Sequence, residues 1–270
     1  MSLTEDPRAL IYEPAGIKVQ SLNCAAAIEA ARTFRTKGGV DANALDPEAI
    51  RILLWNIHKE SDAGWEQDLA RMAKSNDALL LQEVTLLAPL QDVLQVARHR
   101  WIMASSFIYA DNDIGVLTAT RVLPVANCTQ RVVEPLIRIP KSTVISWLPL
   151  GKTAQTIAIA NVHAINFTVT LDAYRAQFAA LVDVLGEHPG PIVLAGDFNT
   201  WSDQRFEVVR EVATRLGLAE VTYADDRRAL FLGHKVDHVF VRGLDVVGSR
   251  ASLVTSSDHN PIEVVLRVSR

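Results

Sequence analysis

The sequence has few cysteines and no long apolar run. Its 270 residues include only Cys24 and Cys128, which lie far apart and outside the polar clusters described below. We expect both to be buried free thiols, as is usual in the reducing cytoplasm. No apolar stretch approaches the ~20 residues that a membrane-spanning helix needs, and residues 1–10 do not resemble a secretory signal. We therefore expect a cytoplasmic protein without a transmembrane segment.

The chain also lacks an excess of positive charge. Its net charge is −4 at pH 7, whereas a protein that binds duplex nucleic acid by neutralising many phosphates is usually basic. This balance argues against tight, sequence-independent duplex binding, although it is compatible with a local basic groove. No H-E-x-x-H motif is present and neither cysteine is near a polar cluster, so the sequence does not favour a zinc site.

Apolar periodicity predicts one α/β domain. Residues 1–49 lack sustained strand alternation and contain one possible helix at 25–34, so we expect an N-terminal extension packed on the domain. From residue 50 to 270 the pattern is regular, and we assign this part to a single catalytic domain. Its middle part contributes three further strand candidates, at residues 114–119, 123–126 and 143–148.

Two segments have the pattern of a βαβ unit. Strands at 52–55 and 78–81 flank an amphipathic helix at 66–75. Strands at 156–162 and 191–195 flank a second helix at 171–185, for which Thr170 is a plausible N-cap. Because the two strands of such a unit are parallel, their carboxyl ends should emerge at the same edge of a sheet.

The C-terminal part resembles a meander. The strand predicted at 236–241 is followed by Gly243, which permits a turn, and then by a strand at 246–254. Antiparallel pairing of these strands would place Asp237 beside Asp258 and His259.

Short polar clusters follow the apolar strands. Unpaired burial of carboxylates and imidazoles is costly, so their repeated occurrence at strand ends indicates one polar site on a rigid scaffold. The clusters are Trp55-Asn56, Gln82-Glu83, Asn161-Val162-His163, Gly196-Asp197-Phe198-Asn199 and Ser257-Asp258-His259-Asn260-Pro261.

These residue types suit a hard metal ion and phosphate chemistry. Mg²⁺ takes oxygen ligands, often one or two carboxylates, and keeps several waters. Glu83 and Asn56 offer such ligands from neighbouring strand ends, and Asp258 can add another. We therefore expect Mg²⁺ as the cofactor, with Mn²⁺ as a possible substitute.

The remaining polar residues suit acid–base chemistry. Hydrolysis of a phosphate ester requires an activated water and stabilisation of the phosphoryl oxygens. Asp197 and His259 are candidates for positioning and deprotonating water, and Asp237 for holding the imidazole in one tautomer. His163 and Asn199 can donate to phosphate oxygens or to the leaving group.

The ordered set of motifs resembles the endonuclease/exonuclease/phosphatase superfamily, which includes DNase I-like nucleases, inositol polyphosphate phosphatases and bacterial sphingomyelinases. Residues 161–167 and 196–202 look most similar to its bacterial YafD-like branch. The resemblance implies a four-layer α/β/β/α sandwich and the roles given above, and it leaves open whether Asp197 or His259 is the general base. It covers residues 50–268 and rests on the five clusters together with Val236-Asp237-His238-Val239-Phe240-Val241.

Other residues are weaker candidates for substrate binding. Trp201 can stack on a base or sugar, or it can simply pack, and Asn166 is close enough in sequence to His163 to line the cleft. Arg227 and Arg228 can meet a phosphodiester, unless the preceding aspartates at 225 and 226 neutralise them.

We expect a metal-dependent phosphodiesterase or nuclease that acts on DNA or RNA. The alternatives are a phosphatase or phosphodiesterase of a small-molecule or lipid phosphoester and, least favoured, a non-catalytic binding module. The basic loops of an abasic-site enzyme and the apolar hairpin of a sphingomyelinase are not recognisable, so the resemblance does not name the substrate.

Overall fold

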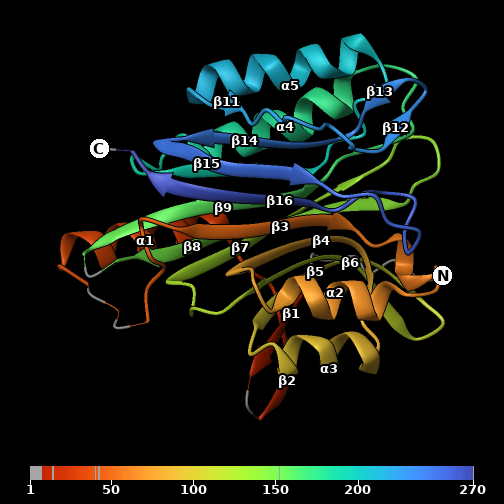
Figure 1. The fold of residues 1–270 in the computed structure, drawn as a ribbon. Helices are drawn as coiled ribbons and strands as arrows, with labels where there is room; N and C mark the ends of the chain where they lie inside the picture. The colour runs from red at the N-terminus through yellow and green to blue at the C-terminus, as the bar shows by residue number, and fades with distance from the viewer. Residues whose placement is uncertain (1–7, 14, 40, 42, 152, 270) are drawn as a thin grey trace.

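Two β-sheets face each other, and helices cover their outer faces (Figure 1). The structure is a computed structural model that describes residues 8–269 apart from residues 14, 40, 42 and 152. Its layers are helices, sheet, sheet and helices, which confirms the four-layer α/β/β/α sandwich predicted from the sequence.

The first sheet contains eight of the described strands in the order β15-β16-β3-β4-β6-β5-β1-β2. Their bounds are β1 Arg8–Glu13, β2 Gly16–Gln20, β3 Ile50–Asn56, β4 Ala78–Thr85, β5 Arg100–Tyr109, β6 Asn112–Thr120, β15 Leu244–Ala251 and β16 Ile262–Val268.

The second sheet contains six described strands in the order β11-β14-β10-β9-β8-β7, and β12 and β13 form a small separate hairpin. The bounds are β7 Ala126–Val133, β8 Pro140–Leu150, β9 Gln155–His163, β10 Ile192–Asp197, β11 Ala219–Glu220, β12 Leu230–Phe231, β13 His234–Lys235 and β14 Asp237–Arg242.

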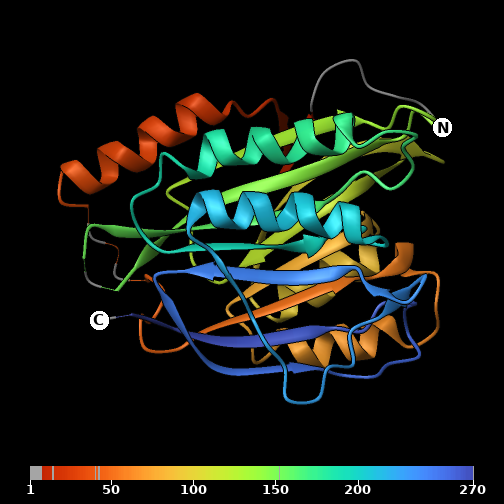
Figure 2. The same ribbon diagram turned by 90° about the horizontal axis from the view of Figure 1, so that it is seen from above.

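The helices divide between the two outer faces. Helices α2 and α3 pack on the first sheet, whereas α1, α4 and α5 lie side by side on the second (Figure 2). Their bounds are α1 Cys24–Thr36, α2 Trp65–Ala73, α3 Ala88–Val96, α4 Asp172–Leu185 and α5 Asp203–Leu216, and a short 3₁₀ turn, η1, covers His58–Glu60.

Strand β3 shows why the apolar runs of this chain are continuous. Ile52 and Leu54 point into the core between the sheets, while Leu53 and Trp55 pack against helices on the outer face. A strand that is buried on both faces needs apolar residues at successive positions and not in alternation.

Both predicted βαβ units are present. Strands β3 and β4 are parallel, with Asn56 opposite Gln82, and β9 and β10 are parallel, with His163 opposite Asp197. The carboxyl ends of each pair therefore lie at one edge, as the sequence predicted.

The predicted C-terminal meander is wrong. Strand β14 pairs with β10 and β11 in the second sheet, whereas β15 pairs with β16 in the first. Gly243, with a φ of 66°, allows the chain to cross from one sheet to the other. Asp237 still meets His259, because the two sheets face each other.

Two local predictions are also corrected. Residues 123–125 are not in a strand, and β7 begins at Ala126. Thr170 does not cap α4, because that helix follows Leu171 and the Thr170 hydroxyl donates to the Asp172 carboxylate at 3.0 Å.

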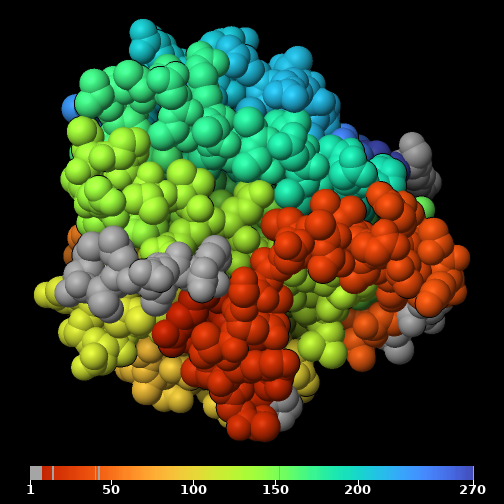
Figure 3. Space-filling model, turned by 180° about the vertical axis from the view of Figure 1, so that it is seen from behind, coloured from red at the N-terminus to blue at the C-terminus, as the bar shows by residue number. Residues whose placement is uncertain are grey.

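The N-terminal segment contacts both sheets. Strands β1 and β2, which the sequence did not indicate, extend the first sheet through the pairing of β1 with β5. Helix α1 packs against β7 and β9 of the second sheet and against α4, which covers that sheet (Figure 3). The domain boundary at residues 49 and 50 stays a prediction. None of the helices in the described residues is long and apolar enough to cross a membrane.

The expectation of two free thiols is wrong. Cys24 at the start of α1 and Cys128 in β7 form a disulfide between residues 104 positions apart. Their proximity depends on the packing of α1 against β7, which their spacing in the sequence does not reveal. The expectation of a reducing compartment rested on free thiols and is therefore no longer supported. The cytoplasmic location stays a prediction.

Candidate active site

Three neighbouring strands of the second sheet place His163, Asp197 and Asp237 in one row. His163 is opposite Asp197 in the β9–β10 ladder, and Asp197 is opposite Asp237 in the β10–β14 ladder. From the facing sheet, Asn56 ends β3 and His259 precedes β16. Residues from distant parts of the chain therefore meet at the end of the sandwich where β12 and β13 lie (Figure 1).

The Asp197 carboxylate is at the centre of this group. Its Oδ2 accepts a hydrogen bond from Asn56 Nδ2 at 3.0 Å and lies 3.5 Å from His163 Nε2. The same oxygen is 3.9 Å from His259 Nε2. Asp197 is 3% exposed, so a charge on its carboxylate needs hydrogen-bond donors or a cation close by.

His259 is paired with Asp237. The distance between His259 Nδ1 and Asp237 Oδ2 is 2.7 Å. Burial by itself would lower the pKa of His259. The carboxylates of Asp237, Asp197 and Asp258 outweigh burial and raise that pKa to about 10. The imidazole therefore carries a proton at neutral pH, which fits the predicted pairing with Asp237.

Glu83 is directed toward the site by a β-bulge. The register of β4 against β6 shifts between Leu81 and Val84, and Glu83 has a φ of 51°. Its Oε2 accepts a hydrogen bond from the Lys59 ammonium, and its Oε1 lies 3.7 Å from His163 Nε2.

Glu83 is ionised at neutral pH. Burial alone would raise the pKa of its carboxyl group. The neighbouring groups of His163, Lys141 and Lys59 reverse this effect and lower the pKa to about 2. Glu83 therefore presents a carboxylate to the cleft.

Lys141 is a site residue that sequence reasoning missed. Its Nζ lies 2.8 Å from His163 Nε2. Burial, followed by this ammonium, lowers the pKa of His163 to about 4. Burial also lowers the pKa of Lys141, although the charges of Glu83, Glu134 and Asp197 oppose the change. A neutral His163 accepts the hydrogen bond at Nε2, so the ammonium and not the imidazole is the donor at this point.

Two parts of the site fit a divalent cation. Oxygens of Asp197 and Asp237 and a nitrogen of His259 lie within 4.8 Å of one another. Among the described residues, Asp237 Oδ1 is buried without a hydrogen-bond partner. Glu83 is the second place, because its carboxylate is ionised and its cationic partner, Lys59, is a flexible and exposed side chain.

Asn199 lies inside the site, whereas Asp258 lies at its rim. The backbone N–H of Asn199 donates to Asp197 Oδ1 at 3.0 Å, and its side-chain Nδ2 donates to the Ala164 carbonyl at 3.0 Å. Asn199 thus holds Asp197 and the loop after β9. Asp258 is exposed at the rim, where its Oδ1 is 3.8 Å from His58 Nδ1.

Trp201 and Asn166 contact each other. Trp201 Nε1 donates to Asn166 Oδ1 at 2.9 Å, and the Trp201 ring lies 4.6 Å from the guanidinium carbon of Arg205. One face of the indole is therefore covered by the arginine.

Arg205 is a second residue that the sequence did not reveal. It is 1% exposed, and it lies on α5. Its guanidinium also stacks on the Tyr174 ring, 4.2 Å away. It donates to the carbonyls of Ile165, Asn199 and Asn166. Arg205 thereby joins the loop after β9 to the loop after β10.

Arg227 and Arg228 are both paired with the preceding aspartates. Arg227 bonds Asp225, while Arg228 bonds Asp226 and Glu220. This is the arrangement that the sequence suggested as the alternative to phosphate binding.

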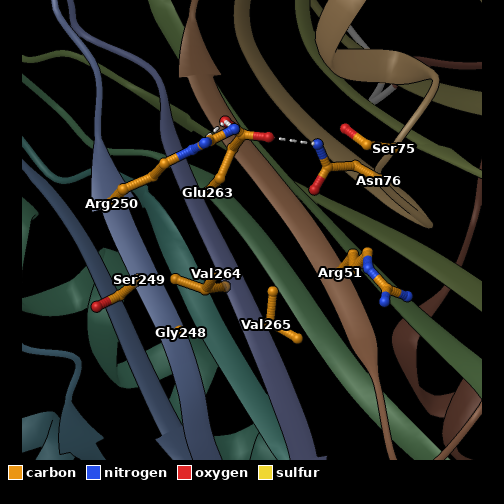
Figure 4. Close-up of a pocket in the computed structure, with 9 residues that line it drawn as sticks. All are labelled: Arg51, Ser75, Asn76, Gly248, Ser249, Arg250, Glu263, Val264 and Val265. Atoms are coloured by element: carbon orange, nitrogen blue, oxygen red, sulfur yellow. Dashed lines mark hydrogen bonds and ion pairs between the residues drawn. The ribbon is translucent and has the colours of Figure 1, made fainter.

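The pocket in Figure 4 lies elsewhere on the molecule. It is lined by residues near the start of β3 and along β15 and β16, and it contains none of the site residues. Glu263 in this pocket already binds Arg250 and Asn76. We assign no site to it.

Solved structures share the fold. The endonuclease/exonuclease/phosphatase from Bacteroides vulgatus aligns with a TM-score of 0.65 at 19% identity, covering 82% of this chain and 99% of that chain. The human Nocturnin catalytic domain with bound sulfate anion aligns at 0.62 and 18%, covering 87% and 99%. D. rerio TDP2 complexed with a single-strand DNA product aligns at 0.58 and 15%, covering 82% and 99%.

Sequence comparison gives the family. A UPF0294 protein of Vibrio campbellii is 38% identical over 218 residues, 80% of this chain and 76% of the relative. A UPF0294 protein of Vibrio vulnificus is 39% identical over 224 residues, with the same shares. The model of the Endonuclease/Exonuclease/phosphatase family matches residues 53–259, a span that runs from the strand carrying Asn56 to His259. The chain therefore belongs to the endonuclease/exonuclease/phosphatase family.

Proposed function

We propose that this protein is a divalent-cation-dependent phosphodiesterase. The observation that carries the proposal is the convergence of the His163, Asp197 and Asp237 row with Glu83 and His259 of the facing sheet. Buried carboxylates beside imidazoles and an ammonium group suit water activation and stabilisation of phosphoryl charge. Membership of the family supports hydrolysis of a phosphoester.

The charges favour Asp197 as the general base. His259 already holds a proton at neutral pH, because its pKa is about 10. It therefore does not accept a proton from water, and it is suited to stabilising negative charge on the phosphoryl group. The Asp197 carboxylate lies 3.9 Å from it and can take the proton of the attacking water. Lys141 is placed to donate to a phosphoryl oxygen.

We assign the cation to Glu83, and Asn56 at the end of the neighbouring strand β3 is the candidate for a second ligand. The Asp197, Asp237 and His259 trio already contains the His259 imidazolium, whereas the cationic partner of Glu83 is the partly exposed Lys59. Oxygen ligands suit Mg²⁺ or Mn²⁺. When bound, such an ion polarises a phosphoryl oxygen and lowers the pKa of a coordinated water.

The test is hydrolysis of bis-p-nitrophenyl phosphate with Mg²⁺, Mn²⁺ or EDTA. We expect cation-dependent turnover that falls by at least ~10³-fold in Glu83→Gln and in His259→Asn, since each change removes a group that stabilises the transition state. The isosteric substitutions retain shape, and circular dichroism checks the fold. Glu66→Gln, at an exposed position of α2, is the matched control and should retain full activity. Unchanged turnover in both site variants would refute the assignment.

A binding measurement locates the cation. Binding of Mn²⁺ is measured by calorimetry in the wild type, Glu83→Gln and Asp237→Asn. Weaker binding in Glu83→Gln alone supports the assignment. Weaker binding in Asp237→Asn alone would move the cation to the Asp197, Asp237 and His259 trio.

Nucleic acid is a second candidate for the substrate. One structural neighbour is D. rerio TDP2 complexed with a single-strand DNA product, and a nuclease is the subclass predicted from the sequence. From the motifs at residues 161–167 and 196–202 we also propose that this chain belongs to a YafD-like branch of the family.

A further inference from the structure

A cleft of about 210 Å³ opens beside the proposed phosphate position. Its lining includes the titratable side chains of Lys59, Glu83, Lys141 and His163. Among them, Glu83 is the residue to which we assign the cation, and Lys141 is the proposed donor to a phosphoryl oxygen. The cleft is therefore continuous with the catalytic centre.

The rest of the lining is mostly apolar. Its walls come from three segments that are distant in sequence, namely the β5–β6 hairpin, the β7–β8 loop and the loop after β9. The apolar lining residues are Phe107, Ile114, Ile137, Ile139, Pro140 and Phe167.

Two of these side chains face water in the structure. Ile137 is 46% exposed and Phe167 is 47% exposed. Exposed apolar side chains that are scattered singly over a surface need no explanation, whereas a group of them at a cleft indicates a binding surface. A ligand with an apolar group would remove both side chains from water and gain affinity in proportion to the area buried.

Beside its six apolar residues, this part of the lining has the polar side chains of Ser106, Glu134 and Asn166. Ser106 Oγ donates to Ser142 at 2.9 Å, and Asn166 Oδ1 accepts from Trp201. Glu134 accepts from the Asn166 N–H at Oε1, and its Oε2, although without a partner, is buried. A nucleobase needs polar partners at its edge, whereas an alkyl chain needs none. The walls therefore favour an alkyl chain.

Resting on the phosphodiesterase function proposed above, we propose that the cleft binds the alkyl chain of an amphiphilic phosphoester. The phosphate lies against Lys141 and against the cation that we assign to Glu83, and the chain extends along Phe107, Ile137 and Phe167. These three residues then determine which phosphoesters are hydrolysed. The charged and the apolar residues of the lining match the two halves of such a substrate.

The first test compares p-nitrophenyl methyl phosphate with p-nitrophenyl octyl phosphate, below the concentration at which the octyl ester aggregates. Each buried methylene increases affinity by about fourfold, so we expect kcat/KM to be at least ~30-fold higher for the octyl ester. Phe167→Ser and Ile137→Ser should each lower the octyl-to-methyl ratio by about tenfold. Equal rates on the two esters would overturn the proposal.

Two exposed apolar residues outside the cleft provide controls. Val169→Ser changes the same loop as Phe167, and Leu232→Ser changes the tip of the β12–β13 hairpin; the two residues are 81% and 70% exposed. Neither lines the cleft, so both variants should keep the wild-type ratio. A loss of the ratio in these controls would show general surface adsorption and would overturn the cleft assignment.

A binding measurement separates this proposal from the phosphodiesterase function. Calorimetry compares octylphosphonate with methylphosphonate and needs no turnover. We expect octylphosphonate to bind at least ~30-fold more tightly than methylphosphonate, and Phe167→Ser to reduce this difference. Such a result supports the cleft assignment even if no ester is hydrolysed; the absence of hydrolysis would then contradict the hydrolytic function alone. Equal binding of the two phosphonates, or tighter binding of thymidine 5′-phosphate than of octylphosphonate, would overturn the alkyl assignment. Hydrolysis of the methyl ester would in that case still support the phosphodiesterase function.

Discussion

At the scale of single residues, the pairing of His259 with Asp237 links charge to stability. The folded-state pKa of His259 is about 10, above the ~6.5 of an unfolded chain. A raised folded-state pKa gives stability that is fully present below pH ~6.5 and is lost as the pH rises through about 10. The Asp237 carboxylate is the largest single source of this increase.

We predict that Asp237→Asn destabilises the protein most at low pH. Breaking a buried ion pair costs about 3–5 kcal/mol, so we expect that loss at pH 6 and a much smaller one near pH 10. The measurement is urea unfolding of both proteins between pH 6 and 10, with EDTA present so that no cation replaces the imidazolium. A difference in unfolding free energy that is constant across this range would contradict the raised pKa.

Arg205 positions two loops of the site from behind. It donates to three carbonyls and lies against two aromatic rings. We predict that Arg205→Met lowers the free energy of unfolding by about 3–5 kcal/mol, because it leaves buried carbonyls without donors. The folded fraction should also show a lower kcat on bis-p-nitrophenyl phosphate, since Asn199 loses its support.

Arg210 on the same helix provides the control for this prediction. It is exposed and forms an ion pair with Glu207, so Arg210→Met should change stability by less than about 0.5 kcal/mol. An Arg205→Met protein with normal stability and kcat would rule out the positioning role.

At the scale of elements, the site depends on the close approach of β9 and β10. A Cβ added at Gly196 would lie 1.9 Å from the Val162 carbonyl oxygen. We predict that Gly196→Ala separates these strands, costs about 1–3 kcal/mol and displaces Asp197 from His163. The rate of hydrolysis should therefore fall by a larger factor than the equilibrium constant for folding.

The matched change is Gly248→Ala in β15, where an added Cβ meets no atom within 4 Å. Thermal unfolding and hydrolysis of both variants check the prediction. Equal behaviour of the two variants would mean that strand spacing does not control the site.

At the scale of the whole molecule, the Cys24–Cys128 disulfide attaches α1 to the second sheet. The linked residues are 104 positions apart, and in the chain-entropy model a loop of ~100 residues gains about 4.7 kcal/mol from such a link. We predict that the Cys24→Ser/Cys128→Ser double variant unfolds at lower denaturant concentration than the oxidised protein. Addition of reductant should shift the wild type to the same midpoint and leave the variant unchanged. A wild type insensitive to reductant would contradict the bond.

Much of the candidate site could be predicted from the sequence, because its residues directly follow apolar strands. Lys141 and Arg205 could not be predicted, for a physical reason in each case. A lysine at the start of a strand is ordinary, and only the nearby Glu83 and Asp197 carboxylates give it a role. An arginine in an amphipathic helix is usually solvated, and Arg205 is buried because two loops fold over it.

The sequence by itself determined the local elements and the sandwich class, because apolar periodicity and βαβ connections depend on neighbouring residues. It also determined that polar groups at strand ends gather at one edge. Only the tertiary structure decided that β14 and β15 belong to different sheets, that Cys24 meets Cys128, and that an apolar cleft continues from the phosphate site. These features depend on which surfaces face each other after the sheets pack, and the packing free energy that selects them is summed over residues far apart in the chain.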